Sequence, residues 1–125
     1  MIPEPAGLVQ QIAAAFDFQG AVGDYQQLLQ WRSDDSEIHY NLPICLEELT
    51  RFDEAVLAYK HAIECDSHNV DAYYNLGLLY LKGQGVLQNE RKAAQWLKKA
   101  ADVGYDAAQS RLGMMYEQGR GVAKN

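Results

Sequence analysis

Residues 71–86 read DAYYNLGLLYLKGQGV, and a related stretch, DAAQSRLGMMYEQGRGV, follows at residues 106–122. Six positions are identical at a spacing of 36 residues: Leu76/Leu112, Gly77/Gly113, Tyr80/Tyr116, Gly83/Gly119, Gly85/Gly121 and Val86/Val122. An internal repeat of this length is typical of a solenoid built from stacked helical units. The sequence therefore predicts a binding scaffold, although it does not name a ligand.

The period continues towards the N-terminus at a spacing of 34 residues. The stretch FDEAVLAY at 52–59 has its counterpart in FQGAVGDY at 18–25. With 125 residues, the chain is expected to form one domain whose core is spread along its length. Its predicted units are about 2–35, 36–69, 70–105 and a half unit at 106–125.

Apolar residues recur at spacings of three and four, as they do on one face of an α-helix. Ile38, Leu42, Cys45, Leu46 and Leu49 predict a helix at 37–49. Similar stripes predict helices at 53–65 and 90–102, and the repeat adds a helix at 106–118.

Helix-terminating and helix-breaking residues refine these boundaries. We expect N-caps at Asp53, Asn69 and Asn89, and helix ends near Gly83 and Gly104. Pro43 falls inside the helix at 37–49, where it predicts a kink or a lost hydrogen bond.

Two kinds of repeat motif are present. The first two units resemble tetratricopeptide repeats, with Ala21 and Ala55 each followed four positions later by a tyrosine. The last two resemble Sel1-like repeats, through Leu-Gly-x2-Tyr-x2-Gly-x-Gly-Val and through KAAQWLKKAADVG at 92–104. The resemblance implies an all-α, right-handed α-α superhelix of about seven helices, the first anchored by Leu8, Val9 and Ile12.

Composition restricts the class of function. The net charge of −6 and the pI near 4.9 argue against nucleic-acid binding, which requires clustered Lys and Arg. No apolar run approaches the ~18 residues of a membrane span. The N-terminal MIPEPAG lacks the features of a secretory signal, which favours the cytoplasm unless a leader has been removed.

Residue types that carry chemistry are few. Cys45 and Cys65 are expected to be free thiols, Cys45 as a buried apolar residue. His61, Cys65 and His68 supply three potential ligands without a fourth, so we predict no metal site and no cofactor. The Gly-x-Gly turns lack the strand and third glycine of a dinucleotide fingerprint and are expected to end helices. In the absence of a recognisable nucleophile or acid/base pair, we predict no enzymatic activity.

The resemblance also implies a groove. In tetratricopeptide-like stacks the first helix of each unit lines a concave surface that commonly receives a peptide or partner helix. The matching positions here are Glu37, Tyr40, Asn41, Ile44, Glu48, Asp71, Tyr74, Asn75, Leu78, Lys82, Ala107, Ser110, Arg111, Met114 and Gln118. Asn41, Asn75 and Arg111 should form a row able to hold a peptide backbone or carboxylate.

Two interpretations of this surface remain open. Tyr40, Tyr74, Leu78 and Met114 would form an apolar floor for a protein or peptide partner, or the tyrosines simply pack against the next repeat. The carboxylate clamp of some tetratricopeptide domains is rejected, because Tyr40, Ile44 and Ala107 replace the residues that it needs.

A second hypothesis is assembly. The last helix has no following helix, so its flank with Leu112, Met115 and Tyr116 is expected to be exposed. It would be covered by a second copy, as in a two-fold homodimer, or by further repeats of a longer protein.

Overall fold

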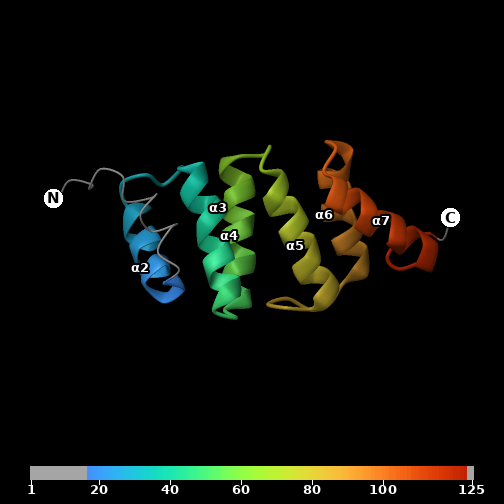
Figure 1. The fold of residues 1–125 in the computed structure, drawn as a ribbon, viewed down its shortest axis with the longest axis horizontal. Coiled ribbons are helices and arrows are strands. Elements are labelled where there is room, and N and C mark those ends of the chain that lie inside the picture. The colour runs from blue at the N-terminus through green and yellow to red at the C-terminus, as the bar shows by residue number, and fades with distance from the viewer. Residues whose placement is uncertain (1–16, 124–125) are drawn as a thin grey trace.

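The computed structural model describes residues 17–123. Within that range the fold is all-helical, and Figure 1 shows the helices side by side along the long axis of the molecule. They are α2 (Phe18–Leu28), α3 (Ser36–Glu48), α4 (Phe52–Cys65), α5 (Val70–Lys82), α6 (Glu90–Asp102) and α7 (Asp106–Gln118). The helices predicted at 37–49, 53–65, 90–102 and 106–118 are confirmed to within one residue. The predicted helix with Leu8, Val9 and Ile12 lies outside the described residues.

Each helix packs chiefly against its neighbours in the sequence. The core is therefore a strip that runs from α2 to α7, as expected for a solenoid. Its largest wholly buried residues are Tyr25, Tyr59, Ile38, Leu76, Leu79, Leu97, Met115, Val22 and Pro43. Cys45, as expected, is buried among them, whereas Cys65 is exposed; both are free thiols.

The Gly-x-Gly turns join successive units at close range. Gly85 (φ +77°) and Gly121 (φ +72°) have positive φ, and a Cβ at either would lie 2.3 Å from a carbonyl oxygen, that of Phe52 or of Glu90. These oxygens belong to the first residues of α4 and α6. The turns after α5 and α7 therefore rest on the second helix of the preceding unit, and glycine is needed there because any side chain would collide with backbone.

Most helix ends are as predicted. The Asn69 and Asn89 side chains accept hydrogen bonds from the backbone N–H groups of Ala72 (3.1 Å) and Lys92 (2.9 Å), which confirms both N-caps. Gly83 ends α5 in the left-handed conformation (φ +71°), and Gly104 (φ +88°) follows the last residues of α6.

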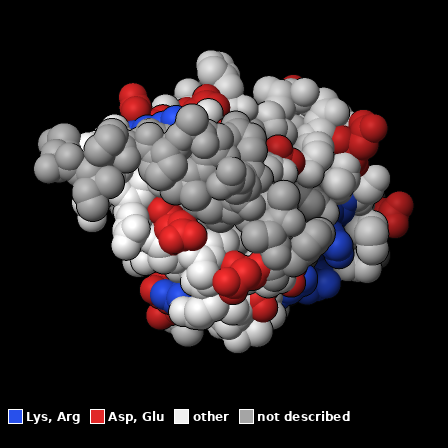
Figure 2. Space-filling view, turned by 60° about the vertical axis from the view of Figure 1, so that its left-hand side comes forward, with Lys and Arg blue, Asp and Glu red and all other residues white. Residues whose placement is uncertain are grey.

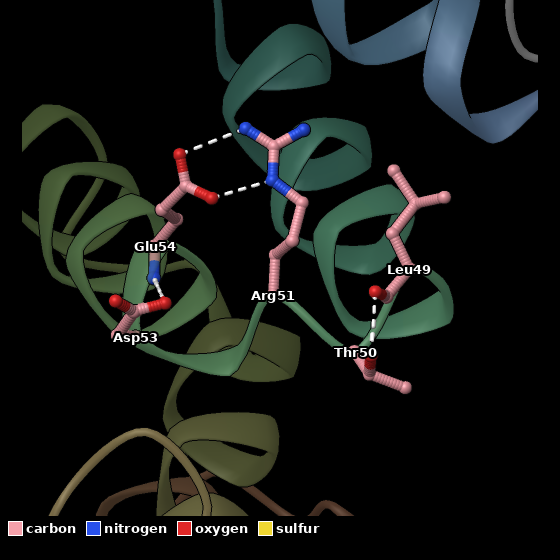
Figure 3. A network of polar contacts seen from close by, with 5 residues as sticks. All are labelled: Leu49, Thr50, Arg51, Asp53 and Glu54. Atoms are coloured by element: carbon pink, nitrogen blue, oxygen red, sulfur yellow. Dashed lines mark hydrogen bonds and ion pairs between the residues drawn. The ribbon is translucent and has the colours of Figure 1, made fainter.

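The predicted N-cap at Asp53 is wrong. Helix α4 begins one residue earlier, at Phe52, because Thr50 takes a positive φ of 58° and closes the turn from α3. Arg51 occupies the N-cap position, and its guanidinium Nη2 lies 2.8 Å from Oε1 of Glu54 (Figure 3). The Asp53 carboxylate instead accepts the backbone N–H of Glu54 within the first turn (2.9 Å).

Helix α3 continues through Pro43, which is buried. The proline removes one backbone N–H donor, and with it one helical hydrogen bond, without ending the helix.

Two features are absent from residues 17–123. No group of three His, Cys, Asp or Glu side chains is placed to hold a metal ion there, and the His61 ring lies 3.7 Å from the Glu64 carboxylate. No helix in this range is long and apolar enough to span a bilayer.

Candidate interaction groove

The predicted groove positions lie on α3, α5 and α7, the first helices of the second, third and fourth predicted units. We call these positions together the groove face. Every one of them is exposed or half-buried, whereas the stripes that include Ile38, Leu76 and Leu112 are buried. Tyr40 is 38% exposed and Met114 is 48% exposed. The three helices thus leave a common set of positions open to solvent.

Tyrosines join α5 to the start of α7 at this face. The Tyr105 hydroxyl donates to Oδ1 of Asp71 (3.1 Å), and the Tyr74 ring meets the Tyr105 ring edge to face, with centroids 5.0 Å apart. Burial raises the pKa of Tyr105, and the hydrogen bond to Asp71 raises it further. Burial and the charge of Asp71 likewise raise the pKa of Tyr40. Asp71 is therefore the charged centre of a tyrosine cluster drawn from two units.

A second polar cluster lies beneath the groove face, between α3, α4 and α5. The buried Tyr59 hydroxyl donates to the Glu47 carboxylate, and burial followed by this bond raises the pKa of Tyr59. The Asn75 side chain lies close enough to Tyr59 to act in the opposite direction and lower its pKa. Burial raises the pKa of Glu47, although Tyr59 and the charge of Lys82 oppose the shift. Asn75, the middle residue of the predicted Asn41–Asn75–Arg111 row, therefore lies beside this buried cluster.

A hollow of about 370 Å³ opens where the groove face meets the first turns of α3 and α5. The loop between α4 and α5 forms its remaining wall. It is lined by Ser36, Glu37, Tyr40, Asp66, His68, Asn69, Val70 and Asp71. Three of these residues carry carboxylates, and the lining includes neither Lys nor Arg.

The structure does not show the exposed apolar flank of α7 that the sequence predicts. Met115 is 2% exposed and Leu112 is 9% exposed, so the expectation that these two side chains are uncovered is wrong; Tyr116 is half-buried. A small hollow between α6 and the turn after α7 is lined by residues that include Leu112, Tyr116, Ala94 and Val122. The α6–α7 packing thus covers the stripe. The open apolar group on α7 is Met114, beside Gly113.

Sequence reasoning missed Tyr105, Glu47 and Tyr59 as parts of this region. A signal for Tyr105 exists: it occupies the position directly before a first helix, where Asp35 and Asn69 act as N-caps in the preceding units. Tyr105 makes no capping hydrogen bond with its side chain, which is free to reach Asp71. An aromatic residue at a position where the other units have a capping side chain therefore indicated a role other than capping. Glu47 and Tyr59 carried no such signal, because their contact depends on how α3 packs against α4.

Comparison with known proteins agrees with this architecture. Residues 70–105 and 106–125 match the Sel1 repeat, and residues 48–83 match a tetratricopeptide (TPR) repeat. The recognised repeats are thus of the TPR kind in the middle of the chain and of the Sel1 kind in its C-terminal half. Proteins built from these repeats are generally protein-interaction modules and typically noncatalytic scaffolds.

Two crystal structures resemble this chain over most of its length. One is a protective antigen of uropathogenic Escherichia coli that displays an SLR fold: TM-score 0.78, 28% identity, covering 94% of this chain and 26% of the antigen. The other is a Sel1 repeat protein from Oxalobacter formigenes: TM-score 0.72, 24% identity, covering 84% of this chain and 42% of that protein. The chain thus spans about a quarter of the antigen and under half of the Oxalobacter formigenes protein.

Proposed function

We propose that this chain is a noncatalytic interaction module whose groove face binds a segment of a partner protein. The observation that supports this proposal is the open face itself: the same positions of α3, α5 and α7 remain accessible although each helix is packed on its opposite side. Tyr40 and Met114 offer apolar surface there, and Arg111 offers a cation that forms no ion pair with another residue of the range 17–123. Such mixed apolar and polar surfaces are suited to peptide recognition. We further propose that the chain acts as a single domain of the four predicted units, in the cytoplasm.

The test is affinity capture with a matched pair of variants. Tyr40→Ala/Arg111→Ala changes the groove face, and Leu57→Ala/Lys98→Ala makes a similar change at exposed positions of α4 and α6, since Leu57 is 61% exposed. Asn75 is left unchanged because it contacts Tyr59. We expect a partner to be retained by the wild type and the control and lost by the groove variant. Equal capture by all three would reject the groove face as the binding surface.

The alternative function is self-assembly through α7. It is favoured by one observation: Met114 is exposed and Gly113 has open space beside it in the described part of the chain. The mass measured by light scattering should then rise with concentration, and Met114→Glu should keep the chain monomeric. A monomer at all concentrations would exclude this alternative.

A further inference from the structure

The hollow between α3 and α5 has a distinct chemical character. Glu37 comes from the first turn of α3, Asp71 from the first turn of α5, and Asp66 from the loop before α5. Tyr40, which is 38% exposed, borders the same space. Carboxylates from three separate segments thus meet an aromatic ring at an opening of about 370 Å³.

Within residues 17–123 these carboxylates form no ion pair with Lys or Arg. Asp66 accepts the backbone N–H of His68 (2.9 Å), and Asp71 accepts the Tyr105 hydroxyl (3.1 Å). Among the described residues no Lys or Arg pairs with either of them or with Glu37. The ion pairs that the described part contains join other residues: Arg32–Asp35, Arg51–Glu54, His61–Glu64, Lys98–Asp102 and Arg120–Glu90.

Helix stability explains only part of this arrangement. An acidic residue in the first turn of a helix interacts favourably with the helix dipole, by about 0.3–1 kcal/mol. That accounts for Glu37 and Asp71 as residues of their own helices. It does not account for Asp66, which lies outside a helix, or for the open space that the three side chains share.

Acidic residues are concentrated in the N-terminal part of the solenoid, where the hollow lies. Residues 17–69 contain eleven Asp and Glu against three Lys and Arg, whereas residues 70–123 contain five against seven. Figure 2, which brings the α2 end of the molecule forward, shows acidic side chains at several places over that end. The groove face therefore runs from an acidic region at α3 towards Lys82 and Arg111 on α5 and α7. Such a field attracts and orients a charged ligand.

We infer that the partner segment is basic and inserts a Lys or Arg side chain into the hollow between Glu37, Asp66 and Asp71, against the Tyr40 ring. This inference rests on the proposed function of the groove face. A guanidinium or ammonium there would form charge-assisted hydrogen bonds with the carboxylates and a cation–π contact with the ring. The segment continues towards Arg111, so its acidic residues, where it has them, follow on the α7 side.

The inference is tested by selecting binders from a phage-displayed library of random dodecapeptides on the immobilised full chain. The selected peptides are then measured against Glu37→Gln/Asp71→Asn. The control is Asp24→Asn/Glu64→Gln, which removes two exposed carboxylates elsewhere and so changes net charge equally. We expect a Lys or Arg to be enriched at one peptide position, and affinity to fall roughly tenfold for the hollow variant and less than about twofold for the control.

The outcomes separate the two proposals. Peptides that require Tyr40 and Arg111 but show no basic preference would overturn the inference and leave the proposed function standing. If the peptides prefer Lys or Arg but the hollow variant and the control lose the same affinity, the inference is also overturned. Nonspecific attraction to an acidic protein would then explain the result. If no peptide binds the groove face, the proposed function and the inference both fail.

Discussion

Gly77 and Gly113 occupy the same position in consecutive repeats but have different surroundings. A Cβ at Gly77 would lie 3.0 Å from Cγ of Leu97 and 3.3 Å from the carbonyl oxygen of Ala93, so this glycine permits the close approach of α5 and α6. No such neighbour lies within 4 Å of a Cβ at Gly113 in the described part of the chain. The sequence motif is identical at both sites, and only the helix opposite distinguishes them.

We therefore predict opposite effects of alanine at the two sites. Gly77→Ala should destabilise the fold, since an overpacking cost of ~1–3 kcal/mol exceeds a helix-propensity gain of up to ~1 kcal/mol. Gly113→Ala should stabilise it by up to ~1 kcal/mol. Urea unfolding of both variants measures the difference. Equal effects would show that α6 does not pack against Gly77 as described.

Glu47 predicts a dependence of stability on pH. Burial raises the pKa of its carboxyl above the ordinary 4.5, so folding favours the protonated form. The stability that Glu47 contributes is thus fully present below 4.5 and lost as the pH rises through the higher folded-state pKa. Glu47→Gln keeps an acceptor for Tyr59, and its stability relative to the wild type should increase between about pH 4 and about pH 7.

The control for this prediction is the exposed neighbour Glu48. Urea unfolding at both pH values is compared for Glu47→Gln and Glu48→Gln. The same pH dependence in both variants would mean that burial of Glu47 is not its cause.

At the scale of single helices, the boundaries follow from local chemistry, and N-caps give the sharpest test. Asn89 accepts the Lys92 N–H at the start of α6, so Asn89→Ala should cost ~1 kcal/mol of stability. Asp53 lies inside the first turn of α4 rather than at its cap, so Asp53→Ala should cost clearly less. Thermal unfolding measured by circular dichroism compares the two. A greater loss of stability for Asp53→Ala than for Asn89→Ala would mean that Asp53 is the N-cap of α4.

The Asp53 error shows where such local reasoning fails. The residue type is a good cap, but Thr50 turns the chain with a positive φ, and Arg51 pairs with Glu54. The start of α4 was therefore decided by the turn from α3. In α3 itself, tertiary packing outweighed a helix breaker, because Pro43 is buried within a continuous helix.

At the scale of the whole molecule, stability should vary along the stack, because each helix depends on its neighbours. Helix α5 packs between α4 and α6, whereas the main described partner of α7 is α6. We predict faster hydrogen exchange for the amides of α7 than for those of α5, as measured by mass spectrometry. Equal protection at high concentration, with loss of α7 protection on dilution, would support self-assembly instead.

The sequence by itself determined the all-helical repeat architecture and nearly all helix boundaries, because the spacing of apolar residues, the Asn caps and the Gly turns act locally. It also indicated which positions of α3, α5 and α7 face away from the core, since those positions recur with the repeat. Only the tertiary structure decided that Asn75 contacts Tyr59, that Leu112 and Met115 are covered, and that Asp66 joins Glu37 and Asp71 at one hollow. These relations depend on the distance and angle between helices, which packing of many side chains sets and no local pattern encodes.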